Sequence, residues 1–131
     1  MTTPTYTFGK TVDLGFDAAI EKVTQALAGE GFGVLSDIDV AATMKKKLGH
    51  EMPPYRILGA CNPTFARQAI EAQPQIGALL PCNVVVRGDA AGAIHVEFMD
   101  PAAVLQMVDH PAVPALATEV RQRLQRVMQA L

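Results

Sequence analysis

Apolar and polar residues alternate in five short segments of the chain, and alternation of this kind is typical of β-strands with one buried face. The five segments are TYTFGKTVD (5–13), FGVLSDIDV (32–40), YRILGAC (55–61), CNVVVRG (82–88) and AIHVEFM (93–99). In the second strand we expect Phe32, Val34 and Ser36 to share one face. The last two segments are joined by the glycine-containing GDAAG, which predicts a β-hairpin.

Other segments repeat their apolar residues every three or four positions, which predicts amphipathic helices. The clearest series is Phe16, Ile20, Val23 and Leu27, and two glycines directly after it are expected to end that helix. Shorter helices are expected at 41–48 and within 100–108, and a long C-terminal helix is expected after Pro111. At Asn62 the side chain can cap a helix whose first residue is Pro63, and this helix is expected to run to about Ala72.

The order of elements is therefore strand, helix, strand, helix, strand, helix, two strands and two helices. This order predicts an α+β fold of two layers, in which a mainly antiparallel sheet of about five strands carries helices on one face. The chain has 131 residues, enough for one domain (1–131) whose core needs no disulfide or metal.

Composition and charge exclude several classes of protein. Apolar residues make up 50% of the chain and charged residues 18%, which indicates a globular protein. The 11 basic and 13 acidic residues nearly balance, so no nucleic-acid partner is expected. No apolar run is long enough for a membrane helix, and the N-terminus lacks the pattern of a secretory signal, so we expect no membrane partner and a cytoplasmic location.

The sequence contains none of the common catalytic motifs. Nucleotide-binding glycine loops, zinc-protease motifs and serine-nucleophile elbows are all missing, so the sequence leaves open whether the protein is an enzyme and indicates no cofactor. Cys61 and Cys82 lie much farther apart than the paired cysteines of zinc sites. Because nothing brings His50, His95 or His110 together, no metal site is predicted, and His95 is expected on the surface of its strand.

The two cysteines are nevertheless the most informative chemical feature. Each stands at the end of a strand and is followed by asparagine, as Cys61-Asn62 and Cys82-Asn83. In a reducing cytoplasm both are expected to be free thiols. Strand alternation places both on faces expected to be buried, where cysteine behaves as a small apolar residue.

A functional interpretation stands beside this structural one. Cys61 directly precedes a predicted helix start, where free N–H groups and the helix dipole lower the pKa of a thiol. We expect a pocket between the 62–72 helix and the sheet edge, lined by Cys61, Asn62, Cys82 and Asn83. A second polar cluster, His50 and Glu51 beside the turn at 52–54, is another place for a pocket.

Three motifs resemble a family of small bacterial and archaeal proteins known as domain of unknown function 302 (DUF302). They are YRILGACNP (55–63), PQIGALLPCNVVV (74–86) and FMDP (98–101), and the likeness extends over nearly the whole chain. The residues that match its signature are Tyr55, Gly59, Cys61, Asn62, Pro63, Gly77, Pro81, Cys82 and Asn83. The resemblance implies a small α+β domain that forms a homodimer, with no established reaction, substrate or cofactor. As part of this signature, Tyr55 joins the candidate ligand-binding residues.

Three functions are compatible with these observations. The preferred hypothesis is a non-enzymatic ligand-binding or sensing module, whose small-molecule ligand occupies the pocket near the two Cys-Asn pairs. The alternative is a thiol-based activity, namely redox chemistry, sulfur or acyl transfer, or capture of a soft metal, with Cys61 and Cys82 as the reacting groups. The third hypothesis is a structural module whose function is its dimer surface.

Overall fold

A five-stranded antiparallel sheet forms the centre of the protein, as shown by a computed structural model that describes residues 4–131. The strands are β1 (Thr7–Val12), β2 (Gly33–Asp39), β3 (Tyr55–Cys61), β4 (Cys82–Gly88) and β5 (Ile94–Met99). Their order across the sheet is β1-β5-β4-β3-β2, and every neighbouring pair is antiparallel. The predicted α+β class and its five strands are confirmed.

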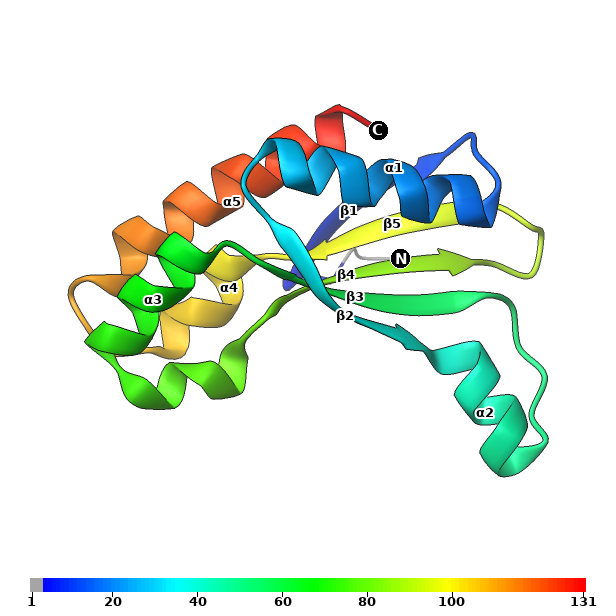
Figure 1. The fold of residues 1–131 in the computed structure, drawn as a ribbon, viewed down its shortest axis with the longest axis horizontal. Helices are drawn as coiled ribbons and strands as arrows, with labels where there is room; N and C mark the ends of the chain where they lie inside the picture. Colours follow the sequence, from blue (N-terminus) through cyan, green and yellow to red (C-terminus); the bar gives the residue numbers. More distant parts are fainter. Residues whose placement is uncertain (1–3) are drawn as a thin grey trace.

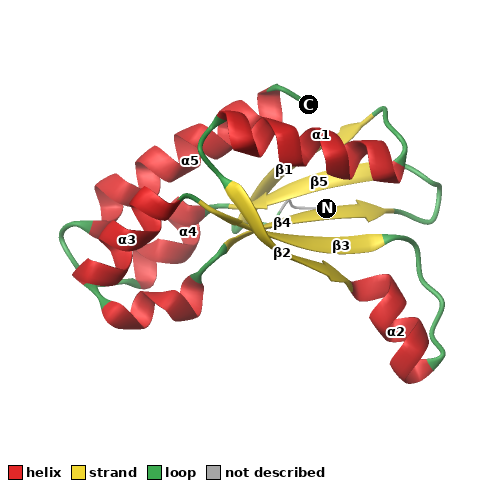
Figure 2. Cartoon of the chain, in the orientation of Figure 1, coloured by secondary structure: helices red, strands yellow, loops and turns green. Residues whose placement is uncertain are grey.

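Helices cover one face and one end of this sheet. They are α1 (Phe16–Gly29), α2 (Val40–Leu48), α3 (Pro63–Ala72), α4 (Pro101–Val104), α5 (Val113–Gln129) and the 3₁₀ helices η1 (Pro74–Leu79) and η2 (Leu105–Met107). Figure 1 shows α1 and α5 lying across the same face, whereas α3 and α4 gather at one end of the sheet. In the colouring of Figure 2, α2 stands apart from the other helices, at the end of β2.

The strand alternation decides which side chains meet the helices. On β4 and β5 the residues Val84, Val86, Val96 and Phe98 are fully buried and belong to one core cluster with Val23 and Leu27 of α1 and Leu124 of α5. The intervening residues of these strands point to the opposite side, which we call the outer face. The outer face carries polar residues, among them an ion pair between Arg87 and Glu97.

One irregularity in β2 corrects the predicted strand pattern. Val34 stands opposite Ala60, but Ser36 stands opposite Gly59, so the register shifts between them and Leu35 is the extra residue of a β-bulge. Because a bulge reverses the alternation that follows it, Val34 and Ser36 point to opposite faces. The prediction that they share a face is wrong, and Leu35 is left 73% exposed.

The helix start predicted at Asn62 is confirmed. The Asn62 side-chain oxygen accepts hydrogen bonds from the backbone N–H of Thr64 at 3.1 Å and of Phe65 at 3.3 Å, and Pro63 occupies the first helical position. Asp100 caps α4 in the same way. These caps satisfy N–H groups that a helix leaves free at its start, and both helices border the cavity described next.

Candidate functional site

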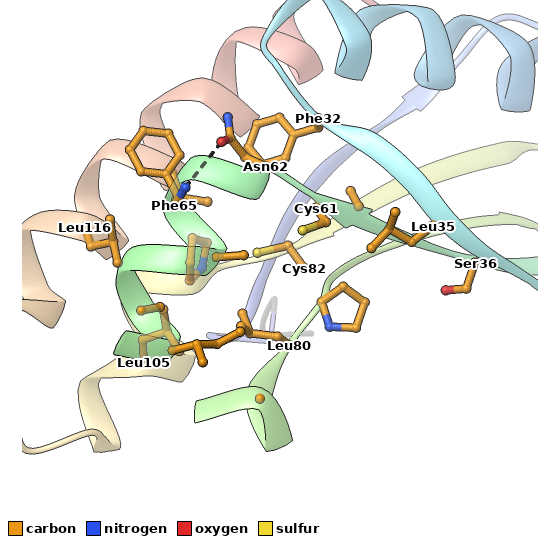
Figure 3. A pocket seen from close by; sticks show the side chains of 18 residues that line it. Phe32, Leu35, Ser36, Cys61, Asn62, Phe65, Leu80, Cys82, Leu105 and Leu116 are labelled. Carbon is orange, nitrogen blue, oxygen red and sulfur yellow. Dashed lines mark hydrogen bonds between the residues drawn. The ribbon is translucent and has the colours of Figure 1, made fainter. Parts of the chain in front are cut away.

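A largely apolar cavity of about 370 Å³ lies at the end of the sheet where β3 leads into α3. Its walls come from β2, β3, α3, η1, the start of β4, and the α4–α5 region. Figure 3 shows Phe32, Leu35 and Leu80 at this cavity together with Phe65, Leu105 and Leu116. Its position between α3 and the sheet edge is the place where the sequence predicts a pocket.

Small side chains explain why space remains here. Ala60 of β3 and Ala66 and Ala69 of α3 all line the cavity, as does Gly77 of η1. Residues with longer side chains at these positions would extend into the cavity. The cavity therefore follows from the residue types on its wall as much as from the path of the backbone.

Both cysteines line this cavity, although they lie on opposite faces of the sheet. Cys82 stands opposite Ala60, and both residues are buried on the helix-covered face. Cys61 follows Ala60 directly and so points the other way, and it is only partly buried. The prediction of a core-facing Cys61 is wrong. Both side chains still reach the cavity because it lies at the end of β3 (Figure 3).

The two cysteines are free thiols. Burial raises the pKa of the Cys82 thiol to about 12, and the nearby Cys61 adds to this increase, since a buried thiolate loses its hydration. Cys82 therefore remains a neutral thiol at physiological pH. A neutral buried thiol behaves as a small apolar group with a weak S–H donor, which suits contact with an apolar ligand better than nucleophilic attack.

The wall formed by α3 is braced by α5. The Arg123 guanidinium lies over the Phe65 ring, 5.0 Å from its centroid, and its Nη1 donates a hydrogen bond to the Glu30 carbonyl oxygen at 3.1 Å. Because one side chain contacts both α3 and the end of α1, it holds the Phe65 ring at the edge of the cavity. The capping bonds of Asn62 fix the start of the same wall.

Two of the five candidate residues lie elsewhere. Asn83 is exposed and points away from Cys82. Tyr55 stands at the opposite end of β3 and lines a separate cavity of about 280 Å³ with Lys45, Glu51 and Met52, which is the region where the sequence suggests a second pocket. The structure thus brings together Cys61, Asn62 and Cys82, and ligand binding by any of the five stays a prediction.

Most residues of the cavity wall could not be predicted from the sequence. Leu35 reaches it through the β-bulge, and Leu105 and Leu116 come from segments more than forty positions along the chain from Cys61. Their only signal is apolar character, which core residues share. Gly59 has a clearer explanation: a Cβ there would lie 2.3 Å from the Ser36 oxygen and 2.8 Å from Pro81 Cγ, so only glycine allows both residues to approach.

Among residues 4–131, no group of three or more histidine, cysteine, aspartate or glutamate side chains is arranged to hold a metal ion. None of the helices in this part of the chain is both long and apolar enough to cross a membrane.

Comparison with protein families identifies the chain. The family described as "Domain of unknown function DUF302" matches residues 8–131. The chain belongs to the DUF302 family. A solved structure described as the "Crystal structure of uncharacterized conserved protein DUF302 from Bacillus stearothermophilus" is similar, with 27% sequence identity and a TM-score of 0.89 over 97% of this chain and 98% of the other. No curated protein matches the chain.

The DUF302 signature residues noted in the sequence concentrate at the cavity. Cys61, Asn62, Gly77, Pro81 and Cys82 all line it, and Gly59 makes room for Pro81 behind it. The motifs on which the resemblance rests are far apart in the sequence, but residues of each line the same cavity. Five of the nine residues that carry the sequence resemblance therefore lie at this cavity.

Proposed function

We propose that the cavity at the end of β3 serves this DUF302 domain as a non-enzymatic binding or sensing site that holds a small apolar molecule. The observation that carries the proposal is the cavity itself, which has a volume of about 370 Å³ and almost no polar lining. Ligand sites in proteins typically measure about 300–1,000 Å³ and are mainly apolar, with a few polar groups.

The lining limits the chemistry of the ligand. Among residues 4–131, no charged side chain lines the cavity, so a charged ligand would lose its hydration without gaining a partner there. An apolar cavity of about 150 Å³ holds one benzene molecule, so this one accommodates a larger hydrocarbon or aromatic body. Within the part of the chain that the structure describes, Ser36 and Asn62 provide the only polar side chains of the lining apart from the two thiols. A polar end of the ligand is expected to lie near them.

The uncharged fluorophore N-phenyl-1-naphthylamine provides a direct test, because the chain contains no tryptophan and its own fluorescence is weak. We expect saturable binding to the wild-type protein. The substitution Ala66→Leu fills part of the cavity and should weaken binding about tenfold or more, which corresponds to about 1.4 kcal/mol. Ala28→Leu is the matched control, because Ala28 is an exposed alanine near the end of α1.

Melting temperatures establish that both variants are folded. The proposal requires that Ala28→Leu binds the fluorophore like the wild type and that Ala66→Leu does not. Equal binding by all three proteins, or no saturable binding by the wild type, would contradict it. A ligand that binds only the folded state also raises the melting temperature with its concentration, which gives a second readout that does not depend on fluorescence.

A thiol-based activity is the second candidate, favoured by the observation that Cys61 is partly buried and lines the same cavity. Cys61, and not the neutral Cys82, would then be the reacting group. Alkylation by iodoacetamide, with mass mapping of the two cysteines, measures this directly. Thiol activity predicts fast, pH-dependent alkylation of Cys61 that the fluorophore slows, whereas a purely packing role predicts slow alkylation that the fluorophore leaves unchanged.

Homodimer formation stays a prediction drawn from the family resemblance, and light scattering on the purified protein measures it. A mass of twice 14.0 kDa that persists on dilution is the expected result. A monomer mass at every concentration would contradict it.

A further inference from the structure

A second, more polar hollow of about 190 Å³ lies along β1 and β5, lined in part by Thr7, Gly9, Thr11, His95 and Glu97. These five residues lie on the outer face, since Thr11 stands opposite His95 and Gly9 stands opposite Glu97. A Cβ on Gly9 would come within 2.1 Å of the Val96 carbonyl oxygen, so glycine is required for β1 to approach β5 this closely. The described residues that line this hollow are all different from those that line the apolar cavity.

A chain of hydrogen bonds runs along the edge of this hollow. Thr11 Oγ1 lies 3.0 Å from His95 Nδ1, and His95 Nε2 lies 2.8 Å from Asp89 Oδ2. The other oxygen of Asp89 accepts hydrogen bonds from the backbone N–H of Ala91 at 2.9 Å and of Ala93 at 3.0 Å. The β4–β5 turn therefore holds the carboxylate, the carboxylate orients the imidazole, and the imidazole meets the hydroxyl.

The direction of these hydrogen bonds follows from the charge on Asp89. The hydrogen bond with His95, reinforced by the backbone N–H of Ala93, lowers the pKa of the Asp89 carboxyl group, so this group is ionised at neutral pH and only accepts hydrogen bonds. Nε2 of His95 must therefore carry the proton that it donates to Asp89. In the neutral imidazole Nδ1 then has a free lone pair, and the Thr11 hydroxyl must donate to it.

We propose that Thr11 is a nucleophilic hydroxyl activated by His95 and positioned by Asp89, and that this site accepts acyl groups from small activated esters. Thr11 Oγ1 would form a bond to the carbonyl carbon while its proton moves to His95 Nδ1. The bond from that carbon to the leaving oxygen then breaks, and the leaving group takes the proton from Nδ1. The products are an acyl ester on Thr11 and a free alcohol or phenol, with the imidazole neutral again. The same combination of hydroxyl, imidazole and carboxylate activates nucleophiles on unrelated folds.

Charged groups surround His95 on the neighbouring strands and the β4–β5 turn. Asp89 faces Nε2 of His95, and Arg87 stands opposite His95 on β4, where its Nε donates to Glu97 Oε1 at 2.6 Å. Lys10 contributes to the lining of the hollow. Only an imidazole with a free lone pair on Nδ1 can take the proton from Thr11.

p-Nitrophenyl acetate is the probe, and the expected result is one acetyl group on Thr11 with release of p-nitrophenol. Tandem mass spectrometry separates Thr11 from the adjacent Lys10, and alkaline hydroxylamine removes an ester from Thr11 but not an amide from Lys10. Thr11→Val should abolish this label, and His95→Gln should slow it about a hundredfold. The controls are Thr118→Val, whose exposed hydroxyl donates only to a backbone carbonyl, and His50→Gln, an exposed histidine.

The ¹⁵N chemical shifts of the His95 ring provide a measurement that needs no variant. In the neutral imidazole they should show a protonated Nε2 and an unprotonated Nδ1, and Asp89→Asn should disturb this tautomer and slow acetylation together. The proposal is overturned if the neutral imidazole of the wild type carries its proton on Nδ1. It is also overturned if Thr11 is acetylated no faster than Thr118, or if His95→Gln leaves the rate unchanged while the protein stays folded.

Discussion

The helix-covered side of the sheet contains two apolar regions that differ in how completely side chains fill them. Between α1, α5 and the middle of the sheet, Val23, Leu27 and Phe98 are each 0% exposed. At the end of β3, residues of the same apolar character surround a cavity of about 370 Å³. The first region lies under the long helices α1 and α5, which contribute branched side chains. The wall of the second includes alanines of the short helix α3.

This difference shows that apolar character alone does not distinguish a filled core from the wall of a cavity. Protein interiors are normally packed with few voids larger than a water molecule, and the region under α1 follows this rule. The region at the end of β3 is not filled in this way. Leu35 and Ile70 at its rim are 73% and 45% exposed. Exposed apolar side chains around a hollow of this size are typical of a ligand site.

The largest expected effect comes from deleting a ring in each region. Phe98→Ala should lower the free energy of unfolding by about 3–5 kcal/mol, because it removes a fully buried ring. Phe65→Ala should cost about 1–2 kcal/mol, because one side of that ring already faces open space. Urea denaturation of both variants measures the difference. Equal losses would show that the cavity wall is packed as tightly as the core.

Cys82 lies at the boundary between the two regions, because it belongs to the core cluster and also lines the cavity. The pKa of its thiol therefore reports whether water reaches this boundary. Its pKa is raised from 9.0 to about 12 in the folded protein. The unfolded chain therefore loses this proton first, so the stability that the neutral thiol contributes is complete below pH 9 and is lost as the pH rises toward 12.

In urea denaturation under reducing conditions, the wild type should lose up to about 4 kcal/mol more than Cys82→Val over this range. Val is the appropriate control because it is apolar, similar in size and does not titrate. Parallel pH profiles for the two proteins would mean that water reaches the thiol. In that case the cavity would resemble an open groove more than a dry site.

A smaller effect is expected from enlarging an alanine in each region. Ala19 of α1 is 1% exposed in the core cluster, and Ala19→Leu should cost about 1–3 kcal/mol through overpacking. Ala66→Leu has open space before it and should change stability by less than about 1 kcal/mol, in either direction. Thermal unfolding of the two variants measures this. A large loss for Ala66→Leu would indicate that the cavity wall cannot accommodate a larger side chain.

Local sequence signals account for nearly all of the secondary structure. The third and fourth strands and the helix from Pro63 to Ala72 occur with the predicted bounds, because alternation, capping by Asn62 and the position of Pro63 act over a few neighbouring residues. The 3₁₀ helix η1 is not predicted, and the helix expected within 100–108 consists of α4 followed by the 3₁₀ helix η2. The bulge at Leu35 is not predicted either. A bulge arises from how two strands pair, and neither strand carries a clear sequence pattern that indicates it.

The candidate site was predictable in part. The Cys-Asn pairs indicate the correct end of the sheet, because both cysteines stand at strand ends that α3 and η1 bring together. The same pairs mislead for Asn83, which points away from Cys82. Tyr55 shares the family signature but stands at the far end of β3. A motif read along the chain does not distinguish neighbours in sequence from neighbours in space.

By itself, then, the sequence determines the elements, their order and the family, because each depends on residue types within short segments. Only the tertiary structure decides that the interior is filled under α1 and open beside α3. It also decides that Thr11, His95 and Asp89 form one hydrogen-bonded chain. The physical reason is that packing and hydrogen bonding between distant segments depend on strand register and helix placement, which no short segment specifies alone.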